Sequence, residues 1–402
     1  MTAAAPSPGT DLDALLASRL RRTLKGSVLE ARVATVVFDA GHSQWTVDLD
    51  QGRGRVRRGA GLEPTLVIRG TPAVLADVIA GRASGIHAFL DGDVTVRGDL
   101  GLSLQLDGMF ADGGTARPVE FPRSRVATVM GIRTSWLEAG PPDAPPIVML
   151  HGLGATNASL LPCLVDLARD HRVIAPDLPG FGQTSAPSAS YSPAWFAAWV
   201  EALQREVGAR RAVLLGNSLG GRIALEAGLT HPGSVSGLIL LTPSPAFRRL
   251  RQWVPMVRLL RPELAHFPLR LTHRVVVEAV RGMFSDPDRL PEPWYDAAAD
   301  ECVRVFRSRA HRVAFFSVAR QIFLEDAYGR NGFWDRLPAL APPALFVWGD
   351  RDRLVPSSFA RHVADALPDA RSMVLEDCGH VPQFEHPLET ARLIRGFLST
   401  LT

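Results

Sequence analysis

The stretch Val213-Leu214-Leu215-Gly216-Asn217-Ser218-Leu219-Gly220-Gly221-Arg222 decides how the rest of the chain is interpreted. An apolar run typical of a strand leads into a Gly-x-Ser-x-Gly turn, and a helical pattern over 223–229 follows it. Glycines allow a strand to reverse into a helix within a few residues, with the serine held in a strained conformation. The helix directs free backbone N–H groups at Ser218. The pattern therefore makes Ser218 a candidate nucleophile, although the same pentapeptide also occurs by chance in Gly/Ser loops.

Length and composition indicate a folded protein of two or three domains. The chain has 402 residues, of which 46% are hydrophobic and 21% charged, and a net charge of +3 that gives no indication of nucleic-acid binding. Its cysteines, Cys163, Cys302 and Cys378, are scattered and odd in number, which argues against a disulfide framework or structural zinc. Residues 1–10 lack the apolar core of a signal peptide, and no apolar run reaches 18 residues. We therefore expect a cytoplasmic location.

The first part of the chain, residues 11–112, has the pattern of a small α+β domain. Its apolar residues change from helical spacing to alternation and back, with Gly-containing turns between the segments. Thr71 is a candidate N-cap for one of its helices. The pattern predicts helices over 11–24, 72–79 and 100–109, and strands over 33–38, 45–49, 65–68 and 94–96.

The order of these elements over about residues 25–112 resembles the sterol carrier protein type 2 (SCP2) fold. The resemblance is carried by the strand before Gly70-Thr71-Pro72, the helix ending in Ile79-Ala80-Gly81-Arg82, and the segment 91–99 with its following helix. It implies an apolar tunnel for a sterol or an acyl lipid, although no single residue can be carried over as a ligand contact. The alternative is a structural or dimerising domain with a filled core. Residues 113–124 are rich in turn formers and form the predicted linker.

Residues 125–402 alternate between strand and helix patterns, which predicts a mostly parallel sheet covered on both sides. Between about 246 and 335 the alternation stops and the pattern is mainly helical, as expected for a helical cap inserted over the sheet edge. The predicted strands are 126–129, 132–137, 145–150, 173–175, 213–215, 238–241, 344–348 and 372–375, and helices are predicted at about 158–169 and 193–207.

A nucleophilic serine needs a base, and the base needs an orienting acid. In a sheet of this kind, the order along the chain is serine, acid, histidine. Asp352 and His380 each follow a predicted strand, so both are expected at the carboxyl end of the sheet together with Ser218. The three residues therefore form a candidate catalytic triad.

At this point the chain resembles the α/β-hydrolase superfamily over about residues 126–402. Four blocks in the expected order carry the resemblance: His151-Gly152-Leu153-Gly154, Asp177-Leu178-Pro179-Gly180-Phe181-Gly182, Gly216-Asn217-Ser218-Leu219-Gly220-Gly221, and the Asp352/His380 pair. The spacing that the family uses around its acid implies Asp352 rather than Asp350. The resemblance also implies an oxyanion hole made by the backbone N–H groups of Leu153 and Leu219. A serine at position 218, where epoxide hydrolases and dehalogenases have aspartate, implies acyl transfer to water.

Other polar residues near these blocks have less direct interpretations. We expect His151 to order the oxyanion loop and Cys378 to be buried beside the site without acting as a nucleophile. Glu385 and His386 are expected to cap the last helix. The remaining histidines show no paired spacing for a metal, so we predict neither a metal nor a cofactor.

The segment 247–262 mixes arginine with apolar and aromatic residues. It fits an amphipathic helix that faces a lipid surface, or a cap helix with a solvated arginine face. The second interpretation is favoured because Pro255 and Pro262 limit the helix, so we expect at most peripheral contact with a membrane. The apolar cap still predicts a hydrophobic pocket for the acyl or alcohol group.

These features together predict a serine ester hydrolase of the lipase or esterase type, whose lipid-carrier-like domain holds or presents an apolar substrate. One alternative is a carbon–carbon bond hydrolase of ring-cleavage dienoates, a branch in which Gly-Asn-Ser-(Leu/Met)-Gly-Gly occurs. Against it, the segment after Gly152 lacks a Gly-Pro-Gly run. The other alternative is a lipid-binding or transfer protein with an idle hydrolase domain, against which the presence of Ser218, Asp352 and His380 argues.

Overall fold

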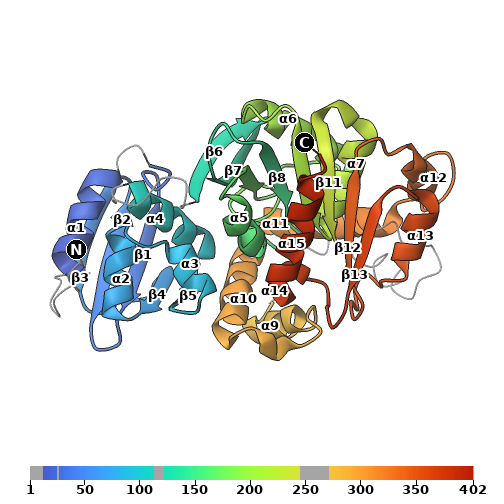
Figure 1. The fold of residues 1–402 in the computed structure, drawn as a ribbon. Helices are drawn as coiled ribbons and strands as arrows, with labels where there is room; N and C mark the ends of the chain where they lie inside the picture. Colours follow the sequence, from blue (N-terminus) through green and yellow to red (C-terminus); the bar gives the residue numbers. More distant parts are fainter. Residues whose placement is uncertain (1–11, 25–26, 113–121, 245–270, 402) are drawn as a thin grey trace.

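The computed structural model describes residues 12–24, 27–112, 122–244 and 271–401, and it contains two sheets with their own helices (Figure 1). The first sheet belongs to the N-terminal part and has five strands in the order β3-β2-β1-β4-β5. The second has eight strands in the order β13-β12-β11-β10-β8-β9-β7-β6. Among the described helices, none is long and apolar enough to cross a membrane.

In the N-terminal domain four helices pack on one face of the sheet (Figure 1). β1 and β4 are parallel and all other neighbours are antiparallel. Thr71 caps α2 as predicted, because its hydroxyl oxygen accepts the Val74 N–H at 3.3 Å. Two elements were not predicted, namely β3 and α3. The elements are α1 (Leu12–Thr23), β1 (Val33–Asp39), β2 (Gln44–Asp50), β3 (Arg53–Arg58), β4 (Leu66–Gly70), α2 (Pro72–Ile79), α3 (Gly85–Leu90), β5 (Val94–Gly98) and α4 (Leu100–Asp112).

Between this sheet and its helices lies an apolar cavity of about 30 Å³. That volume holds no more than a few water molecules. Most of the space is filled by the lining side chains, among which are Phe38, Phe89, Leu100, Leu104, Asp107 and Phe110. A sterol or an acyl chain would therefore have to displace some of them.

The second sheet is mostly parallel, as predicted, and only β6–β7 and β7–β9 are antiparallel pairs. β10 is buried along its whole length, which explains its continuous apolar sequence. β6 begins at Arg123, three residues before the predicted start. The strands are β6 (Arg123–Val129), β7 (Ile132–Ala139), β8 (Pro146–Leu150), β9 (Arg172–Pro176), β10 (Ala212–Asn217), β11 (Val235–Leu241), β12 (Ala344–Gly349) and β13 (Arg371–Leu375).

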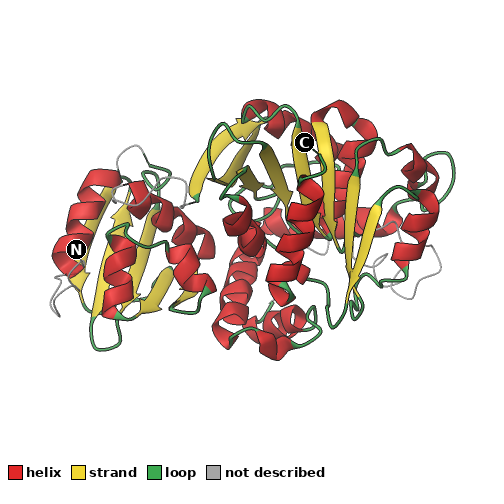
Figure 2. Ribbon diagram, in the orientation of Figure 1, coloured by secondary structure: helices red, strands yellow, loops and turns green. Residues whose placement is uncertain are grey.

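Helices cover both faces of this sheet (Figure 2). The predicted helix at 158–169 is a 3₁₀ turn (Asn157–Leu160) followed by α5 (Leu161–Leu167). α5 and α15 (Pro387–Leu398) share one apolar cluster with one face, whereas α6 (Pro193–Glu206), α7 (Leu219–Thr230) and α13 (Phe359–Ala366) share another with the opposite face. The short α14 (Pro382–Glu385) precedes α15.

The described part of the predicted cap is helical and contains no strand. It comprises α9 (His273–Arg281), α10 (Glu292–Arg307), α11 (Arg309–Leu324) and α12 (Phe333–Arg336). The segment 247–262, for which two interpretations were open, lies outside the described residues. α10 stands between the N-terminal domain and the rest of the second unit (Figure 1).

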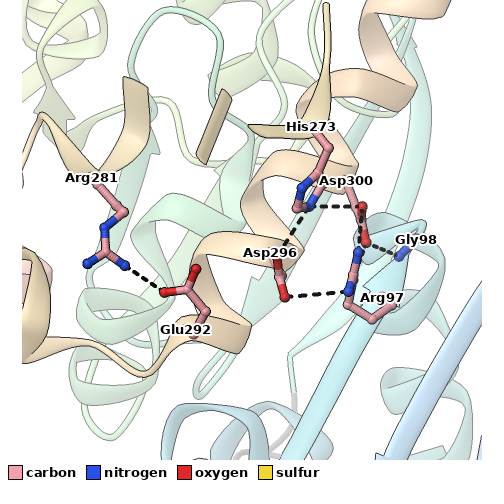
Figure 3. A network of polar contacts seen from close by, with 7 residues as sticks. All are labelled: Arg97, Gly98, His273, Arg281, Glu292, Asp296 and Asp300. Carbon is pink, nitrogen blue, oxygen red and sulfur yellow. Dashed lines mark hydrogen bonds and ion pairs between the residues drawn. The ribbon is translucent and has the colours of Figure 1, made fainter. Parts of the chain in front are cut away.

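The N-terminal domain docks on α10 through charged and aromatic contacts. Arg97 of β5 reaches Asp300 at 2.7 Å and Asp296 at 3.4 Å, and Asp300 also accepts the Gly98 N–H at 2.9 Å (Figure 3). The ring of Phe89 in α3 stacks on Trp294 in the first turn of α10, with 5.4 Å between centroids. One apolar cluster includes buried residues of both domains. The two units therefore share a packed interface.

Candidate active site

The stretch around Ser218 forms a strand, a sharp turn and a helix. β10 ends at Asn217 and α7 begins at Leu219, so that Ser218 alone makes the turn, with φ 54° and ψ −114°. Positive φ is rare for a residue with a side chain and indicates a strained position. A Cβ on Gly216 or Gly220 would overlap backbone atoms of the turn itself or of the end of β8. The two glycines are therefore required for the chain to pass here.

His380 is tied to this turn through its own carbonyl oxygen. The Asn217 side-chain amide donates to His380 O at 3.2 Å, and the Thr242 hydroxyl donates to the same oxygen at 2.8 Å. Asn217 also donates to Thr242 Oγ1 at 3.0 Å. The residue before Ser218 thus holds the loop that carries His380.

Asp352 and His380 form a buried pair. His380 Nδ1 lies 2.7 Å from Asp352 Oδ2, and the Leu354 and Val355 N–H groups donate to Asp352 Oδ1 at 2.7 and 2.9 Å. A carboxylate only accepts hydrogen bonds, so the proton of the neutral imidazole is on Nδ1 and the lone pair is on Nε2. Asp350 lies apart from the pair, is exposed, and accepts the Cys378 N–H at 3.1 Å.

The loop 151–154 lies against Ser218, because a Cβ on Gly152 would be 3.5 Å from Ser218 Cβ. His151 is fully buried: its Nδ1 lies 2.8 Å from Gly152 O and its Nε2 accepts the Leu178 N–H at 2.9 Å. Burial lowers the pKa of His151 to about 4, so the ring stays neutral with its proton on Nδ1. Within the described residues, no acceptor takes the N–H of Leu153 or Leu219.

The fold and the family agree. Residues 145–387 match the α/β hydrolase fold family. The chain belongs to the α/β-hydrolase family. Residues 12–111 match the SCP-2 sterol transfer family, so the N-terminal unit of this hydrolase is an SCP2 domain. Both predicted resemblances are confirmed.

Relatives of the hydrolase include esterases and other hydrolases. A pimeloyl-[acyl-carrier protein] methyl ester esterase of Aeromonas hydrophila subsp. hydrophila is 31% identical over 268 residues, which are 64% of this chain and 96% of the relative. A 2-hydroxy-6-oxo-6-(2'-aminophenyl)hexa-2,4-dienoic acid hydrolase of Metapseudomonas resinovorans is 26% identical over 288 residues, 68% of this chain and 90% of the relative. The crystal structure of a membrane phospholipase A, a bacterial virulence factor, is similar with a TM-score of 0.61 and 25% identity, and covers 82% of this chain and 96% of that one.

Glu385 is a part of the site that the sequence did not reveal. Its carboxylate accepts the Gly379 N–H and the cap residue Ser285's N–H, both at 2.7 Å. His386 is the N-cap residue of α15, as expected, and its carbonyl oxygen accepts the Thr390 N–H at 2.9 Å, although its ring makes no cap bond and Nε2 lies 3.1 Å from Asp377 O. The expectation is wrong for Glu385, whose carboxylate makes these two bonds and does not cap α15. The only signal for Glu385 in the sequence is its place one turn after the histidine loop.

The same loop is also bonded to the cap. The His380 N–H donates to Met283 O at 2.7 Å. Met283 follows α9, so the cap holds the backbone of His380 directly. The two residues are far apart in the sequence, and no local sequence pattern predicts that they meet.

Neither the buried thiol near the site nor a metal cluster offers an alternative reactive centre in the described residues. Cys378 is fully buried, and burial raises the pKa of its thiol, so its thiolate is disfavoured. In the described part of the chain, no cluster of three or more His, Cys, Asp or Glu side chains could hold a metal ion.

Proposed function

We propose that this hydrolase cleaves carboxylic esters through an acyl-enzyme, with Ser218 as nucleophile, His380 as base and Asp352 as the orienting acid. The observation that carries the proposal is the buried His380–Asp352 pair. The backbone carbonyl of His380 accepts a hydrogen bond from Asn217, the residue before Ser218. The strained turn at Ser218 is a second support. A serine hydroxyl is activated by an imidazole within hydrogen-bond reach, a role that the proposal assigns to His380.

The proposed reaction has two halves. Ser218 Oγ attacks the ester carbonyl while His380 Nε2 takes its proton, and the imidazolium is stabilised by Asp352 through Nδ1. His380 then returns the proton to the leaving alkoxide as the carbon–oxygen bond breaks. Water, deprotonated by His380, releases the acid and restores Ser218.

Leu153 and Leu219 are the proposed oxyanion donors. Their N–H groups have no acceptor among the described residues. Leu219 directly follows Ser218 in the sequence, and Leu153 directly follows Gly152, which lies against Ser218. A preorganised donor of this kind contributes roughly 10²–10³ in rate. No metal or cofactor has a part in the proposed reaction.

The substrate class that we propose is a lipophilic ester. The phospholipase A likeness and the SCP2 domain support a lipid substrate, and the SCP2 cavity is the proposed place for a sterol or acyl lipid. Opening this cavity requires its side chains to move. Nucleic acid has no part in the proposal. The three cysteines are free, which is consistent with the cytoplasmic location that we propose.

The dienoic acid hydrolase among the relatives supports a second candidate, cleavage of a carbon–carbon bond in a ring-cleavage dienoate. A panel of p-nitrophenyl esters of increasing acyl length, set against such a dienoate, separates the candidates. The ester proposal predicts hydrolysis that improves with acyl length and no turnover of the dienoate. Preferential turnover of the dienoate would overturn it.

The panel needs a matched inactive variant. Replacing Ser218→Ala should lower kcat by up to ~10⁶. A loss of only a few-fold would mean that the nucleophile is another residue. No hydrolysis by the unaltered chain would favour the third candidate, a lipid-binding protein with an idle hydrolase domain.

A further inference from the structure

One side chain of the hydrolase domain reaches into the SCP2 domain. The Gln183 amide oxygen accepts from the Arg32 guanidinium, and its amide nitrogen donates to Asp99 Oδ1 at 3.1 Å. Gly101, in the first turn of α4, leaves room for this amide, because a Cβ there would overlap it. Gln183 is thus held on two sides by the N-terminal domain.

Charged side chains around Asp99 hold its contact with Gln183 in place. Arg304 of the cap helix α10 lies 3.6 Å from Asp99 Oδ1 and makes two bonds, at 2.5 and 2.9 Å, to Glu301. Asp99 and Glu301 are buried. Buried charges of this kind hold their partners in one geometry, because losing one partner leaves the others unpaired.

The backbone of Gln183 continues the connection into the hydrolase domain. Its N–H donates to Asp177 Oδ2 at 2.8 Å, and the Asn157 N–H donates to Asp177 Oδ1 at 2.9 Å. Asp177 is 2% exposed. Its carboxylate therefore clamps the loop 177–183 to the segment that directly follows the oxyanion loop.

The next contacts set the direction of one proposed oxyanion donor. The Leu178 N–H donates to His151 Nε2, and His151 Nδ1 donates to Gly152 O. A trans peptide is planar, with its C=O and N–H pointing in opposite directions. By holding Gly152 O, His151 therefore orients the N–H of Leu153.

We propose that Gln183 is a positioning residue, through which the SCP2 domain fixes the oxyanion loop. The N-terminal domain is then a structural component of the catalytic centre, in addition to any part it has in carrying lipid. The inference rests on the proposed function. It predicts that breaking the Gln183 contact slows even a substrate too small to use a lipid cavity.

The test uses the full chain and p-nitrophenyl acetate. Gln183→Ala should lower kcat roughly 10- to 100-fold with little change in KM, because small displacements of catalytic groups have effects of up to about that size. Gly101→Ala, which changes only the SCP2 domain and displaces the same amide, should lower kcat in the same direction. Arg97→Ala is the matched control, since it cuts an interdomain contact that does not lead to His151, and it should leave kcat within about twofold.

The outcomes separate this inference from the proposed function. Wild-type kcat on acetate in both Gln183→Ala and Gly101→Ala would overturn the inference while ester hydrolysis stood. A loss confined to long-chain esters would also overturn it, because that pattern indicates lipid presentation alone. Absence of hydrolysis in the unaltered chain would instead remove the proposed function. Circular dichroism and unfolding curves of each variant show that a loss of kcat is not a loss of folding.

Discussion

Asp107 carries a buried carboxyl at the edge of the SCP2 cavity. Burial raises its pKa to about 6, although the Gly85 N–H donates to it at 2.6 Å and the Ser84 hydroxyl at 3.3 Å. The folded chain therefore binds this proton more tightly than the unfolded chain, whose carboxyl has a pKa near 3.8. The contribution of the Asp107 carboxyl to the free energy of unfolding is therefore present at low pH and is lost as the pH rises through about 6.

We therefore expect the stability of the unaltered chain and that of the Asp107→Asn variant to depend differently on pH. Between pH 5 and pH 7.5 the unaltered chain should lose about 1.4 kcal/mol of stability that Asp107→Asn does not lose. Urea unfolding at the two pH values, followed by a probe in the SCP2 domain, measures it. Equal pH dependence in the two proteins would show that this carboxyl titrates normally in the folded state.

Glu385 joins the histidine loop to the cap through two backbone N–H groups. Gln keeps one acceptor but turns an N–H₂ group toward one of these donors, a mismatch worth about 1–3 kcal/mol. We expect Glu385→Gln to lower kcat by roughly tenfold in ester hydrolysis. Glu389→Gln, a change at a partly exposed residue in the next helix, is the control. Equal kcat values in the two variants would mean that the hydrogen bonds of Glu385 are not needed to hold the His380 loop in place.

The turn between β10 and α7 tolerates no added atom at Gly220, whereas Gly396 in α15 has open space around its Cβ position. Gly220→Ala must therefore move the backbone and should destabilise the protein by several times RT, with loss of activity. Gly396→Ala should stabilise it by about 0.5–1 kcal/mol, because alanine favours a helix. Thermal unfolding of the pair tests this, and a stable, active Gly220→Ala variant would contradict the account of the turn.

Most elements could be predicted because their apolar residues have a clear period and their ends have recognisable caps. β3 could not, since it is an exposed edge strand whose residues are mainly arginine, a composition that protects a sheet edge and hides the period. α3 has only six residues, too few to show helical spacing. Its N-cap, Ser84, is the only local sign of it.

The pairing of Asp352 with His380 could be anticipated because residues that follow parallel strands meet at one edge of a sheet. The contact of Arg32 with Gln183 could not, because the two residues are 151 positions apart and belong to different domains. The same holds for the bonds that the cap makes to the histidine loop. Such contacts depend on how the folded domains and the cap pack against one another, and the spacing of apolar residues along the chain does not indicate this packing.

The two domains share an apolar cluster and the ion pairs of Arg97 with Asp296 and Asp300. We therefore expect the full chain to unfold in one transition in calorimetry. Arg97→Glu places like charges against α10 and should split this transition into two. Arg55→Glu, on the exposed edge strand β3, should not. Two transitions in the unaltered chain would show that the interface does not couple the domains.

In the proposed reaction, Ser218 is the activated nucleophile of the whole molecule. The most direct measurement is reaction of the full chain with a fluorophosphonate, followed by peptide mapping in a mass spectrometer. We expect one label, on Ser218, that is absent in Ser218→Ala and much slower to form in His380→Gln, which lacks the base. A label on another serine, or none on the native protein, would contradict it.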